Sequence, residues 1–146
     1  MATESRILLD DRLLIEELLV GLPGAAGASL YTTTYWYYRA CRAAVLGAGG
    51  QLSGPFEQLG EGEQEMAIAS LLELRADIGL PDSRRIVPAM ADVARRHPRL
   101  NLLNLEAIAA AQIHALTPWL SQMASAGVLP AVLDAEGIPW RTIPGD

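Results

Sequence analysis

The chain contains one cysteine and no long apolar run, and each of these features excludes a class of protein. Because Cys41 is alone, the chain has no internal disulfide and no metal site built from several cysteines. No apolar run approaches the roughly 20 residues that a membrane-spanning helix needs. The first residues also lack the charged-then-apolar pattern of an export signal. We therefore expect a cytoplasmic protein without a membrane span.

Positive charge is also scarce. The 146 residues carry 11 basic and 17 acidic side chains, for a net charge of −6, and every basic residue is an arginine. An acidic chain is poorly suited to hold a nucleic-acid backbone by electrostatic attraction, so we expect no DNA partner. Five arginines lie close together in the sequence, and we interpret them as the solvated face of one helix. They are Arg84, Arg85, Arg95, Arg96 and Arg99.

Apolar residues, in contrast, are abundant. Hydrophobic residues make up 51% of the chain and charged residues 19%, which is typical of a compact folded protein. A chain of this length is large enough to bury a core and matches the size of one domain. We therefore predict a single domain over residues 1–146.

Residues 6–20 are best explained as a strand followed by a helix. As one helix, the apolar residues of this stretch would point in every direction around the axis. Ile7–Leu9 is instead a short continuous apolar run, as in a strand buried on both faces. Asp10 or Asp11 can then cap a helix whose first backbone amides lack partners. A carboxylate at the end of a buried first strand lies where open α/β sheets place their chemistry, so Asp10 is the first candidate functional residue.

Strand-like and helix-like segments alternate along the rest of the chain. We predict strands at residues 29–34, 117–121 and 138–143, and a short strand or an extended link at residues 76–80. We predict helices at residues 35–46, 63–75, 83–97, 105–115 and 124–134, and a glycine-rich surface loop at residues 47–55. Such alternation is typical of a parallel sheet covered by helices on both faces. We therefore predict an α/β three-layer sandwich with a mostly parallel central sheet and Ile7–Leu9 as its central strand.

Aromatic residues are few, and five of the eight fall within residues 31–38. The four consecutive rings at residues 35–38 spread over about 300° of a helix with 3.6 residues per turn, so one core cannot take them all. We interpret the outward rings as a contact with a protein partner or a second copy of the chain. Stacking on nucleic-acid bases is the other interpretation of rings beside arginines. The residues that we assign to binding are Tyr35, Trp36, Tyr38, Arg39 and Arg42.

Short segments spread over nearly the whole chain carry a family resemblance. The C-terminal half contributes three of them: residues 104–111, residues 118–121 and residues 137–140. With the opening residues 7–10 and the apolar residues 13–15, they resemble a PIN domain. PIN domains are small α/β nucleases, common as VapC-type toxins of toxin–antitoxin pairs that cut RNA. The resemblance implies a site of about four carboxylates around magnesium or manganese, at the carboxyl ends of the strands.

Position by position, the chain departs from that site. Asp10 is the one family acid that it keeps. Arg39 and Arg42 stand on the second helix, where the family has an acid, and Asn104 replaces the acid that opens the alanine-rich helix. The acid that follows the fourth strand in the family is absent, because Ser121, Gln122 and Met123 stand there. One carboxylate and one amide are a poor magnesium site, so the resemblance implies a degenerate acidic site with Asp10 and Asn104 as its catalytic remnants.

Two further acids lie near these positions in the sequence. We predict that Asp11 points away from Asp10, because neighbouring residues alternate at a strand end, and that Glu106 lies about 200° round the helix from Asn104. Arg39 or Arg42 is predicted to pair with Asp10, which turns the family's metal pocket into an ion pair or a small anion site.

These observations predict a PIN-like protein without metal-dependent nuclease activity. We expect it to act by protein binding or regulation, as a homodimer or with another protein, and without a cofactor. The alternative is an active ribonuclease of toxin type that depends on magnesium or manganese, with Asp10 as its metal ligand and RNA as its partner. Whether the protein is an enzyme therefore depends on which side chains surround Asp10.

Overall fold

The computed structural model describes residues 5–45 and 60–143, and the loop predicted at residues 47–55 lies outside these ranges. The strands are β1 (Arg6–Leu9), β2 (Ser29–Tyr31), β3 (Ile78–Gly79), β4 (Thr117–Leu120) and β5 (Arg141–Thr142). They form one five-stranded sheet in the order β3-β2-β1-β4-β5, and every neighbouring pair is parallel. The central position of β1 confirms the prediction for Ile7–Leu9.

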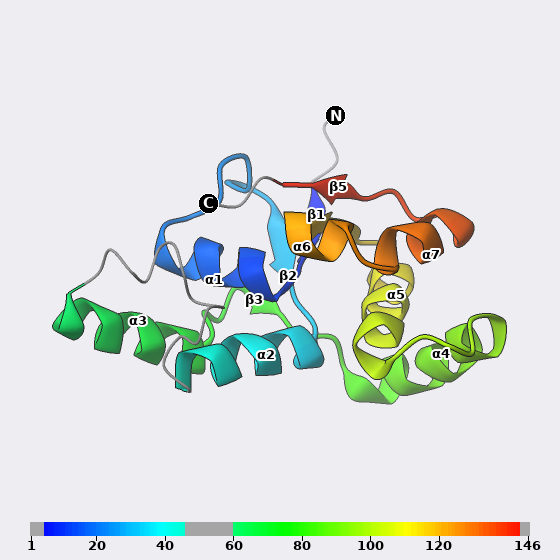
Figure 1. Ribbon diagram of the computed structural model, residues 1–146. Helices are drawn as coiled ribbons and strands as arrows, with labels where there is room; N and C mark the ends of the chain where they lie inside the picture. The colour runs from blue at the N-terminus through cyan, green and yellow to red at the C-terminus, as the bar shows by residue number, and fades with distance from the viewer. Residues whose placement is uncertain (1–4, 46–59, 144–146) are drawn as a thin grey trace.

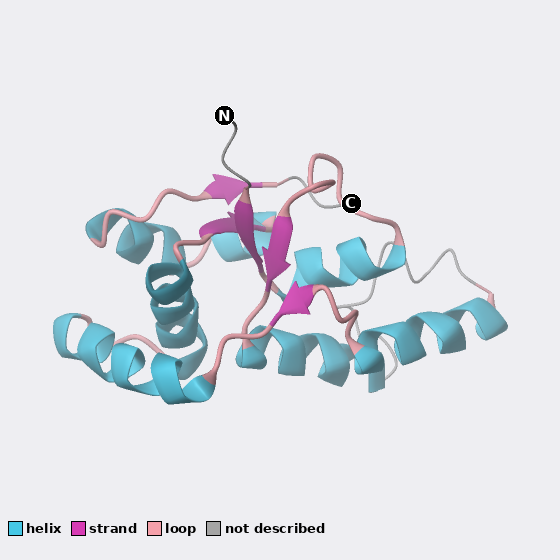
Figure 2. Ribbon diagram, turned by 180° about the vertical axis from the view of Figure 1, so that it is seen from behind, coloured by secondary structure: helices cyan, strands magenta, loops and turns pink. Residues whose placement is uncertain are grey.

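Helices cover both faces of this sheet. They are α1 (Asp11–Leu19), α2 (Thr34–Val45), α3 (Glu61–Glu73), α4 (Ser83–Arg96), α5 (Leu102–His114), α6 (Gln122–Ser125) and α7 (Leu129–Ala135). One core cluster joins the sheet to α1, α2 and α3, and a second joins it to α4, α5 and α7. The result is the three-layer α/β architecture that the alternation predicts (Figure 1 and Figure 2). In the described residues, no helix is long and apolar enough to cross a membrane.

The apolar residues of β1 divide between the two layers. Ile7 and Leu9 belong to the core cluster with α1, α2 and α3, whereas Leu8 belongs to the cluster with α4, α5 and α7. Successive side chains of a strand alternate between faces, so a strand between two helical layers requires a continuous apolar run. All three side chains are at most 2% exposed. Residues 6–20 therefore form a strand and a helix, as predicted.

Polar residues that follow the strands start the next helices. Asp10 follows β1 and caps α1. Thr33 follows β2, and its hydroxyl oxygen accepts a hydrogen bond from the Trp36 backbone N–H at 3.1 Å. Ser121 follows β4 and caps α6. Because parallel strands end at the same edge of a sheet, these caps bring the starts of α1, α2 and α6 to one side of the molecule.

Two predicted helix boundaries are wrong. α5 begins three residues earlier than expected, because the Asn101 side chain accepts a hydrogen bond from the Asn104 backbone N–H at 2.9 Å and caps the helix there. Asn104 therefore lies within the first turn instead of opening the helix. The single helix predicted at residues 124–134 is two helices, because Ser121 starts α6 directly after β4 and Pro130 lies in the first turn of a separate helix, α7.

Candidate functional site

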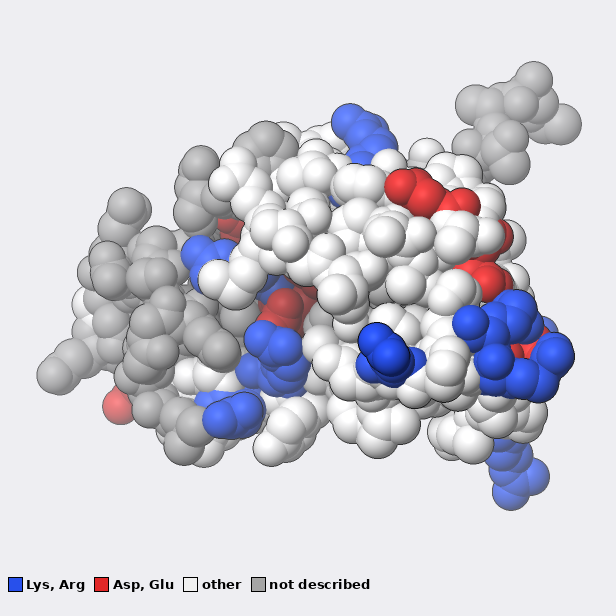
Figure 3. Space-filling view, turned by 45° about the vertical axis from the view of Figure 1, so that its right-hand side comes forward, with Lys and Arg blue, Asp and Glu red and all other residues white. Residues whose placement is uncertain are grey.

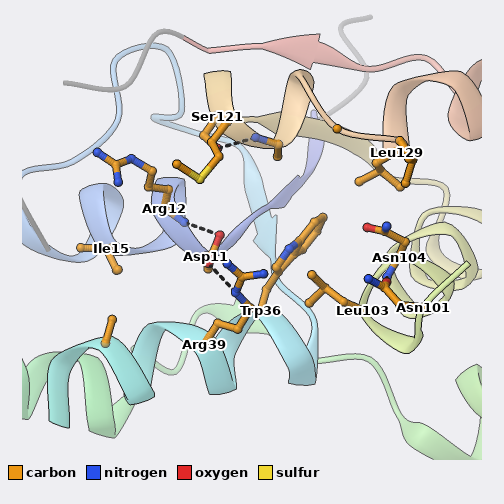
Figure 4. Close-up of a pocket in the computed structure, with 15 residues that line it drawn as sticks. Asp11, Arg12, Ile15, Trp36, Arg39, Asn101, Leu103, Asn104, Ser121 and Leu129 are labelled. Atoms are coloured by element: carbon orange, nitrogen blue, oxygen red, sulfur yellow. Dashed lines mark hydrogen bonds and ion pairs between the residues drawn. The ribbon is translucent and has the colours of Figure 1, made fainter. Parts of the chain in front are cut away.

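A cavity of about 440 Å³ opens at the carboxyl edge of the sheet. α1 and α2 form one wall and α5, α6 and α7 form the other (Figure 4). We call this cavity the edge cleft. It occupies the position at which open α/β sheets bind their ligands. Its polar lining residues are Asp11, Arg12, Arg39, Asn101, Asn104 and Ser121.

Asp10 does not line the edge cleft, because its side chain is fully buried at 0% exposure. Its Oδ1 accepts a hydrogen bond from the Leu13 backbone N–H at 2.9 Å. Its Oδ2 accepts two more from Ser121, from the backbone N–H at 2.8 Å and from the hydroxyl at 2.6 Å. Burial raises the pKa of Asp10, and these hydrogen bonds offset part of that rise. The carboxyl group thus ties the start of α1 to the end of β4.

The donor set around Asp10 does not fit the magnesium or manganese site that the resemblance implies. Both carboxylate oxygens already face N–H and O–H donors, whose hydrogens would confront a bound cation. A hard divalent cation also needs several oxygen ligands in near-octahedral geometry. Within residues 5–45 and 60–143, no group of three or more His, Cys, Asp or Glu side chains converges to hold a metal. Asp10 and Asn104 are therefore not joined in a metal-binding pair.

Asp11 and Arg39 form the ion pair of the edge cleft, at 3.1 Å between Arg39 Nε and Asp11 Oδ2. The prediction that Arg39 or Arg42 pairs with Asp10 is wrong. Asp10 points into the interior, where neutral donors take both of its oxygens, whereas Asp11 begins α1 and faces α2. The two aspartates do point apart, as predicted, but the one that reaches the cleft is Asp11.

Glu106 is a buried carboxylate whose role the sequence did not reveal. Its two oxygens accept hydrogen bonds from the backbone N–H groups of Thr34 at 3.1 Å and Tyr35 at 2.8 Å. It therefore caps α2 from α5, where a negative charge also meets the positive end of the helix dipole. The position of Glu106 among the small apolar residues 105–111 indicates a buried contact, but the sequence does not identify the groups that it contacts.

Asn104 lies on the α5 wall of the edge cleft, and its side chain faces the cavity (Figure 4). Its backbone N–H is bound to the capping Asn101 side chain. No acceptor or donor among the described residues hydrogen-bonds to the Asn104 carboxamide itself. Asn104 is thus a free polar group of the cleft rather than a metal ligand beside Asp10.

The aromatic run on α2 divides between the interior and the surface, as predicted. Trp36 is 3% exposed and lies against the edge cleft, whereas Tyr38 is 60% exposed. Tyr35 is 37% exposed. The Tyr37 hydroxyl donates to the Leu72 carbonyl at 2.8 Å, and burial together with a hydrogen bond to the Cys41 thiol raises the pKa of Tyr37 to about 12.

The arginines near α4 lie on a solvated surface, as predicted, and two of them form ion pairs. Arg95 binds Asp92 at 2.8 Å, and Arg96 binds both Asp92 and Glu136. On the face shown in Figure 3, basic side chains are scattered, some beside acidic side chains and others among uncharged ones. The described residues of that face therefore form no continuous basic surface for a nucleic-acid backbone.

No protein-family model matches this chain, and no curated protein matches it either. The PIN resemblance therefore rests on the residues of the chain alone.

Proposed function

We propose that this protein is a PIN-like domain that acts by binding and not by metal-dependent cleavage of RNA. One observation carries the proposal: three carboxylates near the carboxyl edge of the sheet, Asp10, Asp11 and Glu106, all have structural partners. Asp10 holds Leu13 and Ser121, Asp11 holds Arg39, and Glu106 holds the start of α2.

Carboxylates in such contacts are poorly placed to serve as metal ligands. Drawing Asp10 or Glu106 toward an ion would leave buried N–H or O–H donors without an acceptor, at a cost of about 1–3 kcal/mol for each unsatisfied group. Moving Asp11 toward an ion would release the guanidinium of Arg39 into the same cleft, where its charge repels a cation. The contacts of these three carboxylates therefore indicate that they stabilise the fold.

The outer face of α2 is the surface that we assign to association with a protein. Tyr38 and Val45 are 60% and 66% exposed, and Arg42 lies between them at helical spacing. Aromatic and arginine side chains are enriched at protein interfaces. In a chain of net charge −6, a second copy or another protein suits this face better than RNA.

Metal binding and RNA cleavage test the first part of the proposal. Calorimetric titration with Mn²⁺ should show no site tighter than about millimolar, and labelled single-stranded RNA should stay intact in Mn²⁺ or Mg²⁺. The alternative, a metal-dependent ribonuclease, is favoured by the position of Asp10 at the end of β1. Mn²⁺-dependent cleavage that disappears in a folded Asp10→Asn variant would establish the ribonuclease and overturn the proposal.

Sedimentation tests the association surface. Replacement of Tyr38 by Glu should weaken self-association or partner binding while the circular dichroism spectrum is unchanged. Val87→Glu on α4 is the matched control, because Val87 is 59% exposed on a different helix. If the two substitutions have equal effects, the outer face of α2 is not the association surface. The same conclusion follows if the wild-type protein stays monomeric at high concentration and binds no partner.

A further inference from the structure

The edge cleft combines positive charge with an apolar interior. Its volume of about 440 Å³ lies in the range of small-molecule sites, about 300–1,000 Å³. Two arginines, Arg12 and Arg39, and one carboxylate, Asp11, line it, although the whole chain is acidic. Its remaining lining is largely apolar and includes Ile15, Trp36, Leu103, Val128 and Leu129. A ligand that matches this cleft has an anionic group and an apolar body.

Arg39 presents a guanidinium group to the edge cleft. Its Nε is held by Asp11, and the side chain remains 39% exposed in the cleft. Asp11 contacts the Nε atom of Arg39, and no group among the described residues contacts its two Nη atoms. A guanidinium presents its N–H groups as a planar fork that binds a carboxylate or a phosphate through two hydrogen bonds.

The opposite wall adds a second polar contact and a favourable field. The Asn104 carboxamide faces the cleft from α5, across from Arg39 on α2 (Figure 4). The first turns of α1 and α5 also border the cleft, and their N-termini carry the positive ends of the helix dipoles. Asp10 and Asn101 cap these helices, so the dipoles contribute potential here and not direct ligands.

We propose that the edge cleft binds a small organic anion, a carboxylate or a phosphate monoester with an aromatic or aliphatic body, through Arg39 and Asn104. This site is separate from the outer face of α2, and its existence does not depend on whether the protein associates through that face. An RNA strand fits less well, because it needs several phosphate contacts along a basic track and the cleft offers one cluster.

The first experiment titrates the full-length protein, ¹⁵N-labelled, with phenyl phosphate, benzoate and the neutral benzyl alcohol at equal ionic strength. At least one anion should shift the amide resonances of Arg39 and Asn104 and bind at least about tenfold more tightly than the alcohol. The tighter of the two anions identifies the class of ligand. Equal affinity of the anions and the alcohol, or shifts confined to residues outside the cleft, would overturn the proposal.

Three variants test the role of Arg39. Arg39→Gln should reduce the affinity for the anion to that for benzyl alcohol. Asp11→Asn should raise the affinity, because it removes the carboxylate that competes for Arg39 and repels the ligand. Arg95→Gln is the matched control, because it also removes one arginine from an exposed Arg–Asp pair, far along the chain on α4. Weaker anion binding by a folded Asp11→Asn variant, or an equal loss in Arg95→Gln, would show that the cleft is not the site. Because these measurements use neither RNA nor metal, their outcome is independent of the test for nuclease activity.

Discussion

Asp10 and Glu136 are both carboxylates with several hydrogen bonds, yet their surroundings act on them in opposite directions. Asp10 is enclosed among neutral donors, and burial raises its pKa. Glu136 follows α7 and accepts hydrogen bonds from Arg96 at 2.8 Å, from His97 at 2.8 Å and from Gln112 at 2.7 Å. The Arg96 guanidinium, together with these neighbours, lowers the pKa of Glu136 to about 2. The charge of the donors and the loss of water, rather than the number of hydrogen bonds, decide how each carboxyl group responds to pH.

Removal of the Asp10 carboxyl group should have the largest effect on stability. Asp10→Ala leaves the Leu13 N–H and both Ser121 donors without an acceptor and takes the cap from α1. We expect the free energy of unfolding to fall by about 3 kcal/mol, measured by urea denaturation. A loss below about 1 kcal/mol would mean that water or a neighbouring group replaces the carboxyl group.

The pH dependence of this contact follows from its raised pKa. A carboxyl group whose folded pKa lies above its ordinary value of 3.8 binds its proton more tightly in the folded state. Its contribution to stability is therefore complete below about pH 3.8 and declines as the pH rises through the folded pKa. As the pH rises from about 3.8 through the folded pKa, the free energy of unfolding of the wild type should therefore approach that of Asp10→Asn. A difference that widens with rising pH would show that the hydrogen bonds outweigh burial.

Glu106 is the second largest case, because it is buried like Asp10 but accepts two hydrogen bonds where Asp10 accepts three. Glu106→Ala removes the acceptor of the Thr34 and Tyr35 N–H groups, and we expect a loss of about 2 kcal/mol in unfolding free energy. Because α2 carries Arg39, the same variant should also loosen the Asp11–Arg39 pair. Faster amide exchange in the first turn of α2 would detect the loss of the cap, and unaltered exchange there would contradict it.

Glu136→Gln should cost less, about 1 kcal/mol at pH 7, because its partners lie at the surface. The folded pKa of Glu136, about 2, lies below its ordinary value of 4.5. Its contribution is therefore complete above about pH 4.5 and is lost as the pH falls through about 2, opposite in direction to that of Asp10. Denaturation of the wild type and the variant between pH 3 and pH 7 measures this. A difference that does not shrink in acid would exclude the ion pairs as its source.

The smallest effect is expected for Asp11→Asn. Its partner Arg39 is 39% exposed, and ion pairs at such positions contribute about 0.2–1 kcal/mol. A loss in unfolding free energy larger than that of Glu136→Gln would show that the edge cleft is drier and more rigid than its exposure indicates. The salt dependence of the loss supplies a control, because an exposed pair weakens as salt is added.

Much of the fold could be predicted from particular residues. Ile7–Leu9 predicted a central strand, because an uninterrupted apolar run requires apolar layers on both sides. The crowding of rings at residues 35–38 predicted that some must be exposed, and Tyr38 is. The candidate site was harder to predict. The sequence places Asp10 at the correct edge of the sheet and turns Glu106 away from Asn104, but it predicts an arginine as the partner of Asp10 and does not reveal that Glu106 caps α2.

The sequence by itself determined the features that depend on a few neighbouring residues. These are the strand β1, the aspartate that caps α1 and the alternation of the β1 side chains between the two faces of the sheet. Tertiary structure alone decided which donor each carboxylate meets. Asp10 and Ser121 are 111 residues apart, and Glu106 and Thr34 are 72 residues apart. A hydrogen bond depends on a few tenths of an ångström and on angle, and over such separations both are set by how helices pack on the sheet. Local sequence pattern does not determine that packing. It therefore does not reveal that Asp10 and Glu106 are bonded to backbone N–H groups of the chain itself.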